Sequence, residues 1–362
     1  MNVIAMHETW LILNWPYTLR VVTVGTMVVG FISGFLGTFI VLRKQALVGD
    51  ALSHAALPGV VIAFMLTQIR ELPILLIGAA VASVVAMLLL NAIKRRTRVK
   101  FDAGMALILS GFFGLGQVLI SHLQKTGSAS QAGLSTFIFG QAASMVRADV
   151  VLIILVSLFV FLLLMLFWKE LKLYIFDEPF YRSVGLSERV ASGLLTITVV
   201  LVVVIGIRTI GVVLMSALLI APSVAARQLS NRFLVNATLA GLIGASAGAV
   251  GTYVSYVGST QASLPTGPVV VMLLSGFVLL TMFFSWRRGI VKHRVSVAIY
   301  RRQIIKYKRL IHLYEHGPIP ANQRHEYEPF ISRGTATVVN NEVLVSEKGK
   351  KRVRDLIEGG RQ

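Results

Sequence analysis

Apolar runs of about 20 residues recur along most of this 362-residue chain. Each run is long enough to cross the hydrocarbon core of a bilayer, because about 20 helical residues span about 30 Å. Charged residues make up only 14% of the chain, against about 25% in soluble domains, and the mean hydropathy is +0.75. The sequence therefore predicts an all-α polytopic membrane protein.

The runs predict about nine transmembrane helices, within a range of roughly eight to ten. The expected spans cover residues 18–42, 46–68, 72–93, 103–124, 149–168, 187–207, 209–229, 233–257 and 267–286. Pro58-Gly59 and Pro222 are expected to interrupt two of them, and Ile207 to Thr209 is expected to form a very tight turn. Such interruptions are tolerated inside a membrane where protein or a water-filled cavity satisfies the freed backbone groups.

Several predicted spans are rich in glycine at spacings of three and four residues. Examples are Gly30, Gly34 and Gly37 in the first span, and Gly241, Gly244, Gly248 and Gly251 in the eighth. These spacings place the glycines on one helix face, where the lack of side chains lets a neighbouring helix approach closely. We therefore expect tight helix packing at these positions.

The formal net charge of +19 is unevenly distributed. Residues 287–362 hold 17 Lys and Arg against 7 Asp and Glu, a net charge of +10, and most of the remainder lies in short loops. If the spans alternate, these loops fall on one side, which the positive-inside rule identifies as the cytoplasm. We expect a multi-pass protein of the cell (inner) membrane, with a transmembrane domain at 1–286 and a basic cytoplasmic tail at 287–362.

The stretch Gly49 to Gly59, GDALSHAALPG, places an acid and an imidazole inside an apolar run. Asp50 and His54 are four residues apart, so they share a helix face. Ionisable groups inside a bilayer are costly and usually functional. Oxygen and imidazole donors suit Mn, Fe and Zn about equally, and two ligands form the incomplete shell that a transport site needs. The alternatives are that Asp50 caps the helix or that the two side chains neutralise each other.

A second stretch, residues 173–185, lies between two spans on the predicted cytoplasmic side. Glu178-Pro179 predicts the start of a short helix, since acids and proline are favoured in a first turn, and Gly185 is expected to end it. The aromatic side chains of this stretch include Phe176, Phe180 and Tyr181. An exposed amphipathic helix here would be a docking element for a partner protein or an interfacial helix on lipid headgroups.

Two further stretches give weaker signals. Residues 133–143 are amphipathic and predicted to lie on the outer side, as a re-entrant or lid segment. Residues 216–227 form a small-residue helix broken by Pro222, which is suited to lining a pathway. Ordinary bundle packing is the alternative for both stretches.

Sequence motifs of nucleotide hydrolysis and of proteolysis are absent from the chain. It contains no GxxxxGK[ST] phosphate loop and no HExxH, and it has no cysteine. The sequence therefore excludes ATP hydrolysis by the chain itself, disulfides and thiolate chemistry. We expect a non-enzymatic protein, whose ATPase, where one is needed, is a separate subunit.

Taken together, these stretches resemble the membrane permease subunits of the manganese/zinc/iron ABC-importer family, the ABC-3 family. The matching stretches are LVGDALSHAALPGVVIAF (47–64), GLSTFIFGQAASM (133–145), YIFDEPFYRSVGL (174–186), GVVLMSALLIAPSVAARQL (211–229) and LPTGPVVVML (264–273). The first and fourth are specific to the family, and the resemblance covers nearly all of residues 18–286. It implies a cobalamin-importer-like (type II) permease.

The resemblance also implies partners and residue roles. The partners are a second permease subunit, alike or different, a separate ATPase subunit and an extracellular metal-binding protein. Metal-path roles fall on Asp50 and His54, and Ser53, Ser216 and Pro222 are predicted to belong to the translocation path. The expected coupling helix, which docks on the ATPase, comprises Asp177, Glu178, Pro179, Phe180, Tyr181, Arg182 and Gly185. The sequence FIFGQAASM resembles manganese-type members of the family, so the transported ion is expected to be manganese, with zinc and iron as alternatives. No cofactor is expected to be permanently bound, and ATP is expected to act through the partner ATPase subunit.

The tail has a pattern of its own. Tyr300 to Glu315 predicts a helix, Thr337 to Val345 a β-hairpin around Asn340-Asn341, and Ser346 the start of a basic helix. This order loosely resembles part of a winged-helix fold. Its basic charge suits membrane lipid or contact with the ATPase subunit, whereas nucleic acid is the less favoured partner.

Two other functions are compatible with parts of the sequence. A secondary metal-ion transporter without an ATPase would need more intramembrane carboxylates and an inverted repeat. A membrane-anchored regulator acting through the tail would not need about nine spans as an anchor. Co-purification of an ATPase subunit would distinguish these alternatives.

Overall fold

The computed structural model describes residues 15–69, 71–125, 142, 145–258, 264–285, 290–320, 322 and 324–359. The chain divides into two compact units, Met1–Met282 and Phe283–Gln362. Each unit is described by itself.

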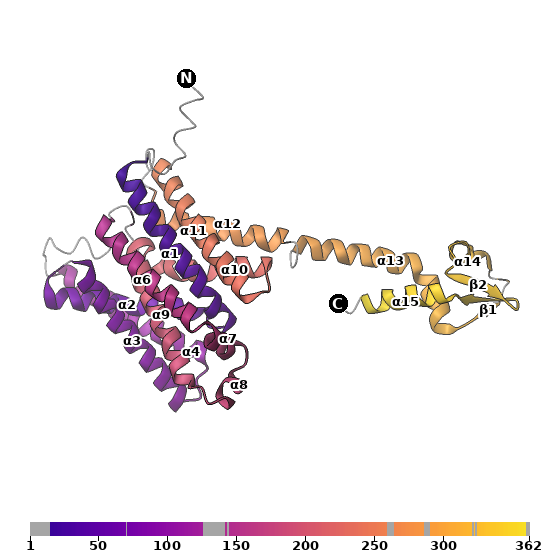
Figure 1. Ribbon diagram of the computed structural model, residues 1–362, viewed down its shortest axis with the longest axis horizontal. Coiled ribbons are helices and arrows are strands. Elements are labelled where there is room, and N and C mark those ends of the chain that lie inside the picture. The colour runs from indigo at the N-terminus through magenta and orange to yellow at the C-terminus, as the bar shows by residue number, and fades with distance from the viewer. Residues whose placement is uncertain are drawn as a thin grey trace, which may run out of the picture. The chain divides into compact units, whose positions relative to one another are not determined.

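The first unit is a bundle of helices (Figure 1). They are α1 (Tyr17–Leu42), α2 (Leu47–Thr67), α3 (Leu72–Arg96), α4 (Phe101–Lys125), α6 (Arg147–Leu166), α7 (Trp168–Phe176), α8 (Glu178–Ser183), α9 (Glu188–Ile210), α10 (Val212–Leu229), α11 (Phe233–Gly258) and α12 (Thr266–Phe284). Eight of the described helices are long and apolar enough to cross a membrane, and α10 is a shorter apolar helix. The prediction of an all-α polytopic membrane protein is confirmed.

Three local expectations about these helices were wrong. Both α2 and α10 continue past their prolines, Pro58 and Pro222, without a break. The turn between α9 and α10 is not at Ile207 to Thr209 but at Gly211, whose φ is +96°. Glycine adopts a positive φ without steric cost, so the chain reverses where the glycine lies.

α1 lies alongside α11 in the bundle, and the two backbones are in contact (Figure 1). A Cβ atom added to Gly30 would collide with the backbone of Gly244, and one added to Gly244 would collide with the backbone of Gly30. Beside them, the Thr26 hydroxyl donates to the Gly248 carbonyl at 3.2 Å and lies 2.9 Å from the Thr252 hydroxyl. The glycines therefore allow the close helix packing that their spacing predicts.

α10 is held against the same central helix. The Ser223 hydroxyl donates to the Gly34 carbonyl of α1 at 3.0 Å, and a Cβ atom on Gly37 would collide with the Leu219 carbonyl. On its other side α10 contacts α2, where the Leu219 side chain packs on Gly49. This packing brings the small-residue helix α10 next to the Asp50 turn of α2.

As far as the structure describes it, the second unit contains three helices and a small three-stranded sheet: α13 (Ile290–His316), β1 (Ile319–Pro320), α14 (Arg324–Ile331), β2 (Ala336–Val339), β3 (Glu342–Val345) and α15 (Glu347–Gly359). The strands are antiparallel in the order β1-β3-β2. Leu310 and Leu313 of α13 pack with Phe330, Val343 and Val353 in a core of their own.

Two predicted features of this unit are present. Asn340 and Asn341 have φ angles of +51° and +65°, as the two central residues of a type I′ hairpin turn require. The Ser346 hydroxyl accepts a hydrogen bond from the Gly349 N–H at 3.1 Å and caps α15. A DNA-binding helix-turn-helix motif consists of two successive helices. Between β1 and β2 the described residues of this unit contain one helix, α14.

Candidate metal path and coupling helix

α2 places Asp50 and His54 one turn apart, and α10 adds a third polar group. His54 Nε2 lies 3.5 Å from Asp50 Oδ1, and the Ser216 hydroxyl of α10 lies close to the Asp50 carboxylate. The Asp50 side chain is 32% exposed and the His54 side chain 13%. Two helices thus bring a carboxylate, an imidazole and a hydroxyl to one place that is only partly covered.

Neither of the alternative roles accounts fully for Asp50. The helix begins at Leu47, its N-cap residue is Ala46, and Asp50 lies inside the first turn rather than at the cap. The 3.5 Å separation from His54 is longer than the 2.7–3.2 Å of a good N–H···O bond. The pair therefore satisfies its own hydrogen-bonding capacity only in part.

The His54 imidazole is fixed by an aromatic neighbour that the sequence did not reveal. Its ring lies edge-on to Phe113 of α4, with centroids 4.9 Å apart and planes at 80°. Its Nδ1 atom is buried and has no hydrogen-bond partner among the described residues. A buried polar atom without a partner is unfavourable, so this ring has capacity for a further ligand or water.

Pro58 adds an acceptor at the same turn. Proline has no N–H, so the carbonyl four residues earlier loses its helical donor. In α2 that carbonyl belongs to His54. The sequence contains this signal, but it becomes meaningful only because the helix continues through Pro58.

The remaining residues predicted for the path are buried elsewhere in the helices. The Ser53 hydroxyl is fully buried and donates to the Gly49 carbonyl of its own helix at 2.7 Å. Pro222 is buried within α10, six residues beyond Ser216. The described contacts group Ser216, but not Ser53 or Pro222, with Asp50, and a path role for the latter two stays a prediction.

The metal-binding capacity of one chain is limited. Within the part of the chain that the structure describes, three or more His, Cys, Asp or Glu side chains are nowhere close enough together to hold a metal ion. Asp50 and His54, with Ser216, therefore form at most part of a coordination shell. The predicted lid segment, residues 133–143, lies outside the described residues except for Ala142.

The predicted coupling helix is α8, and its ends are set by local hydrogen bonds. Asp177 Oδ1 accepts from the Phe180 N–H at 3.0 Å and caps the helix, with Pro179 in the first turn. Gly185, with a φ of +83°, follows its end. The start and end of this short helix lie where the sequence predicts them.

Acidic neighbours hold the charged side chain of α8. The Arg182 guanidinium pairs with Glu178 of the same helix and with Glu188 of α9, the latter at 2.6 Å. The hydrogen bond that Arg182 donates to Glu178, reinforced by the charge of Glu188, raises the pKa of Arg182 above its ordinary value. Arg182 therefore ties α8 to the start of α9.

The aromatic residues of this segment divide into two groups. Phe176 and Phe180 are exposed, but Tyr181, which was expected to be exposed with them, is buried. Its ring packs on Tyr174 of α7 with centroids 5.3 Å apart, and the Arg43 guanidinium lies 4.0 Å from the centre of the Tyr174 ring. This contact chain, Tyr181–Tyr174–Arg43, connects α8 to the end of α1.

Burial also raises the pKa of the Tyr181 phenol, with the charge of Glu170 contributing.

Comparison with known proteins identifies the family. Residues 16–285 match the ABC 3 transport family. The chain is 44% identical over 286 residues to the zinc transport system membrane protein TroC of Treponema pallidum, covering 78% of this chain and 95% of TroC. It is 39% identical over 309 residues to the manganese transport system membrane protein MntC of Bacillus subtilis, covering 85% of this chain and 70% of MntC.

A solved structure agrees with this match. A chain of the structure of PsaBC from Streptococcus pneumoniae in complex with Fab superposes with a TM-score of 0.69 at 28% identity, covering 81% of this chain and all of that one. The predicted family is therefore confirmed by sequence over most of the chain and by fold. The chain belongs to the ABC 3 transport family.

Proposed function

We propose that the chain is the membrane permease of an ABC importer for a divalent transition-metal ion. It is a transport subunit rather than an enzyme, and ATP is hydrolysed by a separate ATPase subunit. The observation that carries the proposal is the meeting of Asp50, His54 and Ser216 inside the helix bundle of a family member. Relatives named as zinc and manganese transport-system membrane proteins support a metal ion as the cargo.

Manganese is the first ion to test. The site offers two oxygen donors, the Asp50 carboxylate and the Ser216 hydroxyl, against one imidazole from His54. The Asp50–His54 pair alone suits all three ions, and the Ser216 oxygen shifts the donor set toward the oxygen donors that suit manganese. Zinc and iron are the alternatives.

Partners complete the transporter. A shell of two or three groups binds an ion weakly enough for release, and water or a second permease subunit, alike or different, supplies the remaining ligands. An extracellular metal-binding protein delivers the ion on the side opposite the basic loops. The exposed side chains of Phe176, just before α8, and of Phe180, within α8, support this helix as the docking site for the ATPase.

The contacts of α8 support alternating access as the mechanism. Movement of α8 by the ATPase displaces Tyr181, and the Tyr181–Tyr174–Arg43 contact chain carries that displacement to the end of α1. Arg43 is the C-cap of α1, and α2 begins at Leu47. A shift of the α1–α2 turn moves Asp50 relative to Ser216 on α10, which changes how the site holds its ion.

Charge supports the orientation of the chain. Arg43, Lys94 and Arg189, from three different helix ends, line one pocket, so these basic ends lie on the same side of the bundle. By the positive-inside rule that side is the cytoplasm. The basic tail from α13 onward is accordingly cytoplasmic.

Metal uptake by cells tests the proposal. We expect Asp50→Asn and His54→Gln each to reduce uptake of manganese or zinc about tenfold or more, since even outer-shell changes at metal sites cost about 10–100-fold in affinity. Asp102→Asn, which alters an exposed carboxylate in the first turn of α4, serves as the matched control. Normal uptake by both variants at normal expression would contradict the site.

A second experiment separates the alternative mechanisms. An ATPase subunit that co-purifies with the chain, together with uptake that stops when that subunit is inactivated, supports the importer. Uptake that persists without it indicates a secondary transporter. A chain that carries no metal but alters gene expression through its tail indicates a membrane-anchored regulator.

A further inference from the structure

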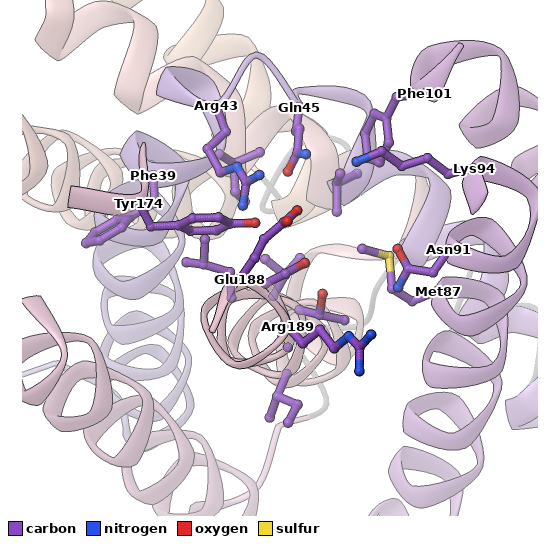
Figure 2. A pocket seen from close by; sticks show the side chains of 18 of the residues that line it. Phe39, Arg43, Gln45, Met87, Asn91, Lys94, Phe101, Tyr174, Glu188 and Arg189 are labelled. Atoms are coloured by element: carbon purple, nitrogen blue, oxygen red, sulfur yellow. The ribbon is translucent and has the colours of Figure 1, made fainter. Parts of the chain in front are cut away.

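A pocket of about 790 Å³ lies at the basic end of the first unit, among α1, α3, α7 and α9 (Figure 2). From α2 it is lined by Val48. Val48 and Asp50 are two residues apart, which places them about 200° apart around the helix. The pocket is therefore on a different face of α2 from the Asp50–His54 pair.

Positive charge gathers in this pocket. Its cationic lining residues are Arg43, Lys94 and Arg189. Figure 2 shows Arg43 on one wall and Lys94 on the opposite one, with Glu188 and Arg189 of α9 between them. Glu188 is the one carboxylate among the described lining residues, and it pairs with Arg182 of α8 at 2.6 Å. Within the described part of the chain none of the three cations forms an ion pair with a carboxylate, so the pocket favours an anion.

Away from these cations the pocket has an apolar wall that faces out of the bundle. Val84 and Leu88 of α3 are 39% and 63% exposed, and Ile197 of α9 is 53% exposed. At 1.5 Å per residue, Lys94 lies about 15 Å along the helix from Val84, and Arg189 about 12 Å from Ile197. One leaflet, half of a hydrocarbon core of about 30 Å, is about 15 Å thick, which is close to both of these lengths. The pocket thus extends from headgroup level into one leaflet.

We propose that this pocket binds an anionic phospholipid of the cytoplasmic leaflet. Its phosphate lies between the cations, and an acyl chain follows the wall formed by Val84, Leu88 and Ile197. The volume is in the range of about 300–1,000 Å³ that is common for ligand pockets. A soluble anion has no use for the apolar wall, and a zwitterionic lipid leaves the positive charge uncompensated.

The site has a consequence for coupling. Arg43 both lines the pocket and ends the Tyr181–Tyr174–Arg43 contact chain. An anionic headgroup bound to Arg43 would hold in place the end of α1 that the Tyr181–Tyr174–Arg43 contact chain displaces when α8 moves. Lipid binding itself does not depend on the identity of the cargo or on the proposed transport function.

Lipid retention by the purified full-length protein tests the proposal. The delipidated protein is incubated in detergent with equal amounts of phosphatidylglycerol and phosphatidylcholine of identical acyl chains, and bound lipid is measured by native mass spectrometry. We expect preferential retention of phosphatidylglycerol. Lys94→Gln and Arg189→Gln should each weaken it about fivefold, since one basic residue near an anionic surface contributes about that factor, and together about 25-fold.

Controls make the result specific to this pocket. Arg232→Gln removes an exposed cation from the turn between α10 and α11 and should leave retention unchanged. Lys94→Arg with Arg189→Lys keeps the charge and should retain the lipid, which guards against misfolding of the neutral variants. Equal retention of the two lipids, unchanged retention in a folded double variant, or full displacement by excess inorganic phosphate would each overturn the proposal.

Discussion

Gly244 in the contact between α1 and α11 allows a direct test of how this bundle is held together. Its α-carbon faces Gly30 so closely that a Cβ atom would collide with the Gly30 backbone, which cannot rotate away as a side chain can. Gly276 on α12 has nothing within 4 Å of the same position. Gly244→Ala and Gly276→Ala therefore make the same chemical change in two different surroundings.

The size of the effect follows from comparing the two variants. Alanine is favoured over glycine in a helix by about 1 kcal/mol, and this gain is common to both. Overpacking a filled interface costs about 1–3 kcal/mol, and only Gly244→Ala incurs that cost. At roughly 2–4 °C per kcal/mol, we expect the Gly244→Ala protein to unfold at a temperature several degrees below that of Gly276→Ala.

Thermal unfolding of both variants in the same detergent, followed by tryptophan fluorescence, measures this difference. The heating rate is held fixed, because membrane proteins often unfold irreversibly and the apparent unfolding temperature then depends on that rate. Gly244→Leu extends the series and should lower the unfolding temperature further. If Gly244→Ala unfolds at or above the temperature of Gly276→Ala, the two helices do not depend on backbone contact, and the reasoning is refuted.

Two further substitutions test local contacts. Tyr181→Ala removes the packing on Tyr174 and should reduce metal uptake per ATP hydrolysed several-fold without releasing the ATPase, whereas Tyr181→Phe keeps the ring and should keep coupling. Transport and ATPase assays on vesicles measure this ratio, and equal coupling in the two variants and the unmodified protein would count against the contact chain. Ser346→Ala removes the cap of α15, at a cost of about 1–2 kcal/mol, and should speed hydrogen exchange of the α15 amides about 5–30-fold. Lys348→Ala in the same helix should leave exchange unchanged, and unchanged exchange in Ser346→Ala would show that the cap is dispensable.

The membrane-spanning helices were predictable because the bilayer imposes a simple physical requirement. A helix in hydrocarbon must be long and apolar, and that requirement is local, so it is readable in each run of residues. The first span was expected at 18–42 and is Tyr17–Leu42; the second was expected at 46–68 and is Leu47–Thr67. The ends of the short helix α8 were predictable for a similar reason, since its proline and the glycine after it act on the backbone nearby.

Contacts between helices were not predictable in the same way. Ser216 was expected to line a path, but its position beside Asp50 depends on how α10 packs next to α2. Phe113 gave no signal, because an aromatic residue in an apolar run looks the same whether it faces lipid or a functional side chain. The packing of Tyr174 on Tyr181 and Arg43 depends on how α7 lies beside α8 and α1. Burial of Tyr181 likewise follows from the position of α7, which the sequence of α8 does not contain.

Proline at position 58 shows how a correct signal led to a wrong structure. The expected interruption of the second span is limited to one missing hydrogen bond, to the carbonyl of His54. Gly59, which was read with it as part of the break, instead packs against the backbone of Gly78 on α3. The two residues thus have separate roles: one frees an acceptor beside the imidazole, and the other brings two helices together.

The depth of the Asp50–His54 pair defines what must move during transport. Asp50 lies in the first turn of α2, at the end where Arg43 caps α1, and about 20 Å of helix follows His54 to Thr67. On that side Leu57, one turn beyond His54, is buried and packs directly on Gly116 of α4. If the proposed path passes between α2 and α4, these helices must separate at Leu57 before an ion from the side opposite the basic loops reaches the pair. With the proposed orientation, this predicts that the pair acts on the cytoplasmic side of the apolar contact, at the inner exit of the path.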